Sequence, residues 1–430
     1  MTARRLTTLA VAALAAAATA QAQTPPPNLT LRDAEQRALA GHPGVIAAQA
    51  AAQAAEQTVS EAKSAYWPTL FGSVTGVGAP DNTRITAGAL NNPSIFSRFA
   101  LGITAAQLVT DFGRTGDLVQ TQQLRASAQV QDVTTVRATV LLDVDRAYFD
   151  ALRAQAVLRV AQQTVDARQI VVDQVSALAQ SGLKSGLDLS FARVNLSQAQ
   201  LLRVQAQGDV QGAFATLNTA MGAPQSFTYQ LVEEALVPPS SDDASTVIAE
   251  ALRDRPDVAS ERLIAQAASK FVLAERALSF PTLAAVGTTG VTPYRDQVLN
   301  EHYSAAGFNV TVPIFNGGLY SARRSEAMYR AQMADEARQD LENRVARDVT
   351  TAWVQVRTGY QRVDLTNQLV VQARDALDLA QQRYDMGLSS IVELTQAQLN
   401  ETEAEIAQAS ARYEYQAKSA ALKFETGQLR

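Results

Sequence analysis

The chain has 430 residues, a formal net charge of −5 at pH 7 and no cysteine. The absence of cysteine excludes disulfides, thiolate metal sites, thiol nucleophiles and a lipid-modified amino-terminal cysteine. The modest acidic charge does not favour nucleic acid as a partner. Aromatic residues make up only 6% of the chain while alanine is abundant, which favours close-packed helices over a bulky globular core.

Residues 1–22 are typical of a secretory signal peptide. Arg4 and Arg5 form its basic end, Leu6 to Ala18 its apolar stretch, and Ala20-Gln21-Ala22 its small-residue cleavage site. The alternative, a membrane-spanning helix, needs about 20 apolar residues and is less favoured. No other stretch has the length and apolar character of a spanning helix, so we predict an exported chain without a helical anchor.

Two helices are predicted directly after the signal. The sequence Thr30-Leu31-Arg32-Asp33 resembles a capping box that opens a short first helix. His42 precedes a proline and therefore disfavours the helical region, which ends this helix. The second helix is expected from Pro43 to Tyr66, since proline is accepted in a first turn and Pro68 stops the helix soon afterwards.

A β-hairpin is predicted in each half of the chain, at about 67–110 and about 281–315. Its strands show a period of two, with turn-rich loops at 79–82, 91–93 and 293–296. An isolated hairpin is only marginally stable, so these four strands need partners from other chains or in a mixed sheet. The alternating apolar residues are Phe99, Leu101, Ile103 and Ala105 in the first hairpin, and Phe308, Val310, Val312 and Ile314 in the second.

Two very long helices, at about 113–181 and 317–386, form the skeleton of the chain. The run from Asp117 to Gln180 contains neither glycine nor proline and, at about 1.5 Å per residue, would be roughly 95 Å long. Both helices are expected to leave the hairpins through glycine corners. These corners are Gly113 and Gly116 in the first half, and Gly317 and Gly318 in the second.

Each long helix ends in a turn of small residues, after which a shorter helix returns, at about 187–221 and about 390–427. We call these two turns the tips. The residues of the first tip are Gly182, Leu183, Lys184 and Ser185, and those of the second are Gly387, Leu388, Ser389 and Ser390.

The two halves are copies of each other. Gly182-Leu183 recurs 205 positions later as Gly387-Leu388, and Pro68-Thr69-Leu70 recurs 213 positions later as Pro281-Thr282-Leu283. Two constant offsets indicate a tandem duplication. We therefore predict a mostly helical α+β chain with structural repeats at 23–222 and 244–430, joined by a linker at 223–243.

This order of elements, given twice, resembles the TolC family of outer-membrane efflux and secretion channels over essentially the whole mature chain. The resemblance is carried by Leu29-Thr30-Leu31, Ala38-Leu39 with Pro43, the strand starts at Pro68 and Pro281, Phe315-Asn316-Gly317-Gly318, and both tips. It implies that three chains pool four strands each into a twelve-stranded β-barrel in the outer membrane. A long α-helical barrel would continue this β-barrel through the periplasm.

The resemblance also implies the function and the partners. The chain would be a homotrimeric, passive exit duct in outer-membrane lipid, serving a tripartite efflux pump or a type I secretion system. Its helical tips would dock a periplasmic adaptor protein and an inner-membrane pump or ABC exporter. Drugs, metal ions and secreted proteins all remain open as cargo, and no cofactor is implied.

The resemblance further implies a periplasmic gate near the tips. Asp188 falls on the family's acidic position, and Tyr384 on a tyrosine that donates its hydroxyl to that carboxylate. Glu393 matches the acidic position after the second tip, Ser389 stands where an arginine link occurs, and Gln396 replaces a second acid. We therefore expect a weaker lock, carried mainly by Asp188 and Tyr384, with Asp188 and Glu393 favouring cations at the constriction.

Purely structural interpretations of the same residues stay open. An acid in the first turn of a helix often only favours the helix dipole, which applies to Asp188 and Glu393. Tyr384 could be a packing residue and Lys184 a solvated charge. Gly182 and Gly387 are expected to end helices under either interpretation.

Two other classes of protein are less consistent with the sequence. An enzyme is not favoured, because the only histidines, His42 and His302, belong to no metal-ligand or triad pattern and no phosphate-binding loop is present. We accordingly predict no catalytic or metal site. The stronger alternative is a periplasmic coiled-coil adaptor or structural protein of a transport complex. It predicts helices that fold back at the tips but not two amphipathic hairpins at duplicated positions.

Overall fold

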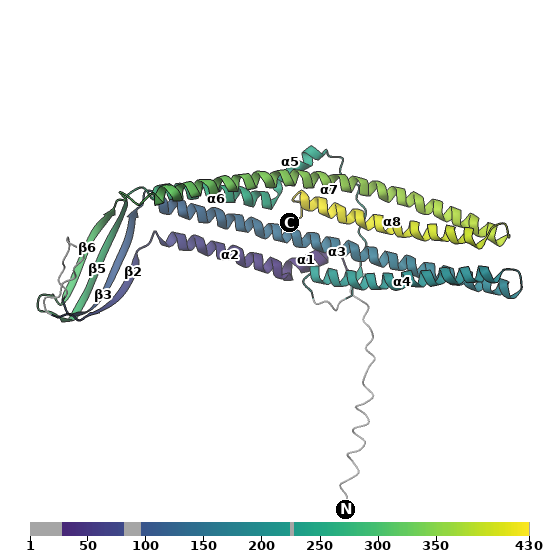
Figure 1. Cartoon of the computed structure of the whole chain (residues 1–430), viewed down its shortest axis with the longest axis horizontal. Helices are drawn as coiled ribbons and strands as arrows, with labels where there is room; N and C mark the ends of the chain where they lie inside the picture. Colours follow the sequence, from purple (N-terminus) through teal and green to yellow (C-terminus); the bar gives the residue numbers. More distant parts are fainter. Residues whose placement is uncertain (1–27, 81–95, 224–227, 430) are drawn as a thin grey trace, which may run out of the picture.

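The computed structural model describes residues 28–80, 96–223 and 228–429. The predicted signal peptide and the predicted loop at 91–93 lie outside these residues, as do the last two residues of the loop at 79–82. The molecule is elongated, with a small sheet at one end and long helices that reach to the other end (Figure 1).

Short helices open each repeat. α1 spans Leu31–Gly41 and begins with the predicted capping box, in which Thr30 and Asp33 bond each other's backbone N–H groups. α2 spans Pro43–Ser64 and ends two residues earlier than predicted. The second repeat has the matching helices α5, Ala244–Asp254, and α6, Pro256–Ala277. α1 and α5 have 11 residues each, and α2 and α6 have 22 each, as expected of a duplication.

The two hairpins form one antiparallel four-stranded sheet with the order β2-β3-β5-β6. β2 spans Thr69–Val77, β3 spans Arg98–Thr110, β5 spans Thr282–Arg295 and β6 spans His302–Thr311. The repeats meet where β3 pairs with β5, so β2 and β6 are left at the edges. The prediction for the last strand was wrong beyond Thr311: Val312 and Ile314 lie outside β6, next to Pro313, which has no N–H to donate to a ladder.

The long helices and the returning helices follow the predicted scheme. α3 spans Arg114–Gln180 and α7 spans Leu319–Asp385, with 67 residues each. α4 spans Gly186–Ala220 and α8 spans Ile391–Glu425, with 35 residues each. The two copies thus lie side by side as two helical hairpins (Figure 1).

Three of the four predicted corner glycines form the corners. Gly113, Gly317 and Gly318 have φ angles of 97°, 61° and 85°, in the left-handed region that favours glycine. Gly116 was assigned wrongly, because it lies inside the first turn of α3. Asp111 closes this corner, since its Oδ2 accepts hydrogen bonds from the Thr115 N at 2.7 Å and the Thr115 Oγ1 at 2.6 Å.

The main core lies about midway along the helices, around Tyr148 of α3, whose side chain is fully buried. Its hydroxyl lies 2.8 Å from the Leu29 carbonyl oxygen and 2.7 Å from that of Val232. These bonds hold the short parallel strands β1, Asn28–Leu29, and β4, Gln230–Leu231, against α3. The predicted linker is therefore held against the core from β4 onward, where Gln416 Nε2 also donates to the Glu234 carbonyl at 2.9 Å. Within the described residues, no helix combines the length and the apolar character needed to cross a membrane.

Candidate functional site

The two tips share one backbone construction. α3 ends with Gly182 at φ 73°, and the N–H of Leu183 donates back to the Leu178 carbonyl at 2.9 Å. α7 ends with Gly387 at φ 74°, and the N–H of Leu388 donates to the Arg383 carbonyl at 2.8 Å. Both are Schellman-type ends, in which glycine takes the left-handed conformation and orphan carbonyls are satisfied. The helix-ending geometry expected of both glycines is present.

Asp188 closes the first tip locally. Its Oδ2 accepts hydrogen bonds from the Ser185 N at 3.0 Å and from the Ser185 Oγ at 2.8 Å, while the Asp188 N donates back to Ser185 Oγ. This is a capping box at the start of α4. The contacts of Asp188 are therefore those of a first-turn residue, in agreement with the purely structural interpretation.

Tyr384 lies where the two helical hairpins meet. Its side chain is only 4% exposed and packs against Val172, Val175, Ile391 and Leu394. Its hydroxyl has no hydrogen-bond partner among the described residues, so the expected bond to Asp188 is not made. The printed hydrogen bonds of the Asp188 carboxylate are instead those that its Oδ2 accepts from Ser185. Asp188 is nevertheless close enough to act electrostatically: burial and then its charge raise the pKa of the Tyr384 hydroxyl.

Lys184 links the two tips, a role that the sequence analysis assigned to the pair Asp188 and Tyr384. Its Nζ lies 3.7 Å from the centre of the Tyr384 ring and donates to the Tyr384 carbonyl at 3.4 Å. A cation over an aromatic face is attracted by the ring quadrupole. The interpretation of Lys184 as a solvated charge was therefore wrong, and the side chain connects the first tip to the second.

The remaining predicted residues of the second tip make only local contacts. Glu393 forms an ion pair with Arg383 of the same hairpin at 3.0 Å, which sequence reasoning missed. Gln396 Nε2 donates to the Asn400 side chain along α8. The Ser389 Oγ is buried without a partner in the part of the chain that the structure describes. An exposed apolar surface remains around both tips and includes Leu183, Leu187, Met386, Leu388 and Val392.

Two further polar contacts connect the two helical hairpins, at positions along the helices away from the tips. Arg168 is 7% exposed, and its guanidinium donates to the Gln398 carbonyl at 2.8 Å and contacts Thr402 Oγ1 at 3.3 Å. Burial lowers its pKa, which the charge of Glu401 opposes. Asn195 Nδ2 donates to Thr395 Oγ1 at 2.9 Å, from α4 to α8. Sequence reasoning missed Arg168, although it interrupts a stripe of small apolar residues on α3 at heptad-like spacing (Ala161, Val165, Val172, Val175).

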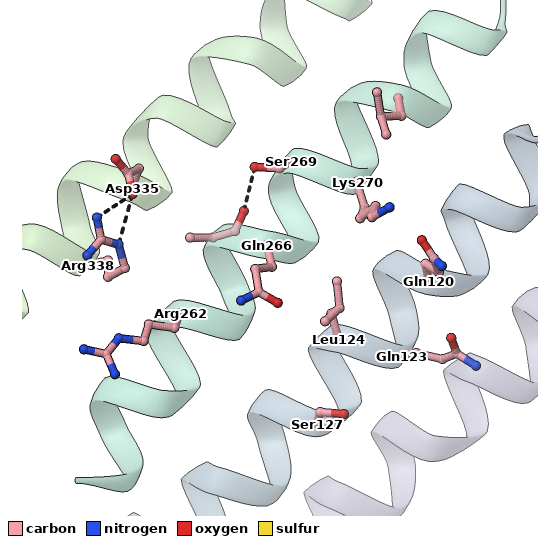
Figure 2. Close-up of a pocket in the computed structure, with 12 residues that line it drawn as sticks. Gln120, Gln123, Leu124, Ser127, Arg262, Gln266, Ser269, Lys270, Asp335 and Arg338 are labelled. Carbon is pink, nitrogen blue, oxygen red and sulfur yellow. Dashed lines mark hydrogen bonds and ion pairs between the residues drawn. The ribbon is translucent and has the colours of Figure 1, made fainter. Parts of the chain in front are cut away.

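A groove of about 990 Å³ lies at the sheet-proximal end, between α3, α6 and α7 (Figure 2). α3 contributes Gln120 and Gln123, and α6 contributes Gln266 and Lys270. Arg338 binds Asp335 at 2.8 Å on α7 (Figure 2). Its lining combines amides and charged side chains with the apolar side chains of Leu124, Ala265 and Leu273. The described residues contain no cluster of three or more His, Cys, Asp or Glu side chains that could hold a metal ion.

Comparisons with known proteins agree on one family. The family model described as "Outer membrane efflux protein" matches residues 34–223 and 247–428. The chain is 23% identical over 400 residues to "Outer membrane protein TolC" of Escherichia coli (strain K12), which covers 88% of this chain and 78% of that protein. It is 24% identical over 343 residues to "Solvent efflux pump outer membrane protein SrpC" of Pseudomonas putida, which covers 77% of this chain and 71% of that protein.

The fold is likewise similar to solved channels. The structure of the outer-membrane channel OprN has a TM-score of 0.82 at 19% identity, over 92% of this chain and 89% of that one. This likeness confirms the predicted protomer fold, in which one small sheet is attached to two long helical hairpins.

Proposed function

The chain belongs to the outer membrane efflux protein family, and from this membership we propose that three copies form the passive exit duct of a tripartite efflux pump or a type I secretion system. The resemblance to the TolC family predicted from sequence is confirmed. The protein is a non-enzymatic efflux channel of the outer membrane with its helical part in the periplasm.

The observation that carries the trimeric duct is the incomplete sheet. β2 and β6 each have one neighbour and one open edge within the described residues. Open edges are a liability in water, and in lipid an unpaired backbone group costs several kcal/mol. Exposed apolar side chains, among them Leu70, Val74, Ile103, Phe308 and Val310, also remain on these strands. If three sheets close into a twelve-stranded barrel, the open strand edges pair with one another and the apolar side chains face lipid.

The helices support a water-filled continuation of that barrel. The groove of Figure 2 is lined by glutamines and by charged residues such as Lys270 and Arg338, which remain hydrated on a duct wall. α7 carries surface ion pairs along its length, for example Arg330 with Glu326 and Arg344 with Asp340. A helix that is polar on much of its surface is stable only with water on one side and a packed neighbour on another.

We propose that the gate of this duct lies at the tips. Within one chain the two hairpins are linked there by Lys184 and Tyr384, and higher up by Arg168 and by Asn195 with Thr395. Opening the duct requires these hairpins to move apart, so each link favours the closed arrangement. Asp188 contributes through its charge close to Tyr384 and through the capping box that shapes the first tip.

We propose that the tips also dock the periplasmic adaptor and, through it, an inner-membrane pump or ABC exporter. Leu183 and Leu388 are 71% and 67% exposed, and they recur at equivalent positions of the two copies. A trimer would therefore carry a ring of six exposed leucine side chains, two from each chain. Exposed apolar patches of this kind are typical of protein-binding surfaces.

The alternative function, a periplasmic coiled-coil adaptor, accounts for the folded-back helices but not for the sheet. An adaptor without a lipid anchor washes off membranes, whereas a channel sediments with the outer membrane and needs detergent. Extraction therefore separates the two functions before any other measurement.

The decisive experiment is mass in detergent combined with planar-bilayer conductance of the mature protein. We expect a trimer with small, cation-selective steps that grow in the double variant Asp188→Ala with Tyr384→Leu, which removes the capping box and the ring that Lys184 contacts. The matched control, Asp143→Ala with Tyr329→Leu, changes exposed residues far from the tips and should leave the steps unchanged. Large conductance steps in the unmodified protein would support the proposed duct but contradict the proposed gate. A folded monomer without conductance would overturn the duct and favour the adaptor.

A further inference from the structure

A pocket of about 490 Å³ is lined by residues of α1, α3, α5, α7 and α8 and of the segment that joins the two repeats. The ends of α5 and α8 lie about midway along the long helices (Figure 1). We call this pocket the equatorial pocket. Its volume is within the range of small-molecule sites, and much of its wall is apolar. Apolar side chains in the wall include Leu31, Phe149, Val247, Val356 and Leu422.

Two buried acceptor atoms belong to the wall of this pocket. Asp145 of α3 is 3% exposed and Gln416 of α8 is 6% exposed. The Asp145 Oδ1 and the Gln416 Oε1 have no hydrogen-bond partner among the described residues. The orientation of the Gln416 amide is set, because its Nε2 donates to the Glu234 carbonyl. A buried acceptor without a donor is costly, so this wall calls for a ligand that donates hydrogen bonds.

The charges around Asp145 specify the sign of that ligand. Acidic residues from three other parts of the chain line the pocket or act on Asp145, and one lysine lies on α8. These groups are Glu35 of α1, Glu234 and Asp242 of the inter-repeat segment, Glu250 of α5, and Lys423 of α8. The excess of carboxylates favours a cation over an anion or a neutral molecule.

We propose that the equatorial pocket binds a small organic cation, with its ammonium group at Asp145 and Gln416 and its apolar body against Phe149 and Val247. The site is separate from the tips and from the sheet. It is built from both repeats and from the segment between them, so an occupant would hold these parts together in the middle of the molecule.

The proposal is tested by calorimetric titration of the detergent-purified full mature protein with 2-phenylethylammonium. We expect one saturable site per chain, with much weaker binding of the neutral analogue 2-phenylethanol. At pH 8, Asp145→Asn removes the ionisable carboxyl group at nearly constant shape and should weaken binding of the amine by about tenfold or more. The control Asp150→Asn changes an exposed carboxylate one turn further along α3 and should leave binding unchanged.

Two further measurements keep the proposal falsifiable if the Asp145 variant does not fold. Ala235→Trp places a bulky side chain in the wall at an exposed position and should block the pocket without disturbing the core. Burial and the neighbouring Glu35 raise the pKa of Asp145 to about 8, so protons compete with the cation and affinity should rise between pH 6 and pH 8. Equal binding of amine and alcohol, unchanged binding in Asp145→Asn or Ala235→Trp, or no saturable binding at all would each overturn the assignment.

Discussion

α3 and α7 are copies of equal length, yet they occupy different environments. α3 packs against α1, α2, α4, α6 and α8, whereas α7 packs against α5, α6 and α8. α3 buries Asp145 and Arg168, while the equivalent positions 205 residues later hold Thr350 and Ala373. Duplication thus sets the length and the ends of a helix, but the number of neighbours decides whether a charge on it is buried. The ionisable groups buried on α3 are thus removed from water, whereas no charged side chain of α7 is among its buried residues.

The tips show the same divergence on a smaller scale. Asp188 bonds back to Ser185, whereas Glu393, at the equivalent position, extends to Arg383. Lys184 reaches Tyr384, but the residues equivalent to these two, Ser389 and Ala179, offer neither a charge nor a ring. The two hairpins are therefore joined by an asymmetric link.

The largest expected effect concerns the buried carboxyl of α3. Burial, then the charge and hydrogen bond of Glu35, raise the pKa of Asp145 from 3.8 to about 8, against the opposing charge of Lys423. Between these values the folded protein holds a proton that the unfolded chain has lost. Stability should therefore fall as pH rises through this window, by up to about 1.4 kcal/mol per pH unit.

This effect is measured as the Tm of the detergent-purified protein between pH 5 and pH 8. We expect the Tm of the unmodified protein to fall across the range and that of Asp145→Asn to change less and to be higher at pH 8. Asp143→Asn, an exposed carboxylate two residues away, is the control and should keep the slope of the unmodified protein. Identical slopes in all three proteins would show that Asp145 is ionised in the folded state.

The second effect concerns the buried guanidinium of α3. Arg168→Ala removes two hydrogen bonds from a charged donor to α8, which should destabilise the contact between the hairpins by about 2–3 kcal/mol. Hydrogen exchange of the amides near Gln398 and Thr402 would report the loss. The exposed Arg137→Ala on the same helix should change stability by less than about 0.5 kcal/mol. If amide hydrogen exchange near Gln398 and Thr402 is the same in both variants, the contact of Arg168 does not stabilise the packing of the two hairpins.

The outcome of the sequence predictions follows from the same contrast. The equal lengths of paired helices and the left-handed Gly182 and Gly387 were predictable, because they depend on local sequence and on the repeat offset. The contact of Lys184 with Tyr384 was not, because it joins residues 200 positions apart whose separation depends on how the hairpins pack. The end of β6 at Thr311 was missed because the apolar alternation continues past Pro313.

The third effect tests the asymmetric link between the tips. Lys184→Met keeps the length of the side chain and removes its charge, so the attraction to the Tyr384 ring is lost. A cation–π contact is worth about 0.5–2 kcal/mol, and 1.4 kcal/mol is tenfold, so open time in bilayer recordings should rise by roughly twofold to thirtyfold. Lys184→Arg keeps a cation and should restore the closed state. Lys63→Met, on α2, should have no effect, and a similar rise there would contradict a role for this link.

The smallest effect distinguishes the two acidic residues of the tips. Arg383 and Glu393 lie 3.0 Å apart with side chains that are 54% and 45% exposed, so the pair should contribute less than about 1 kcal/mol and be weakened by salt. Glu393→Gln should therefore raise hydrogen exchange at the start of α8 slightly at low salt and not at high salt. Glu393→Asp should instead shorten the side chain enough to bond back to Ser390, as Asp188 does to Ser185, and make exchange there insensitive to salt. If Glu393→Asp behaves like Glu393→Gln, side-chain length is not what separates the two tips, and the difference must come from Arg383.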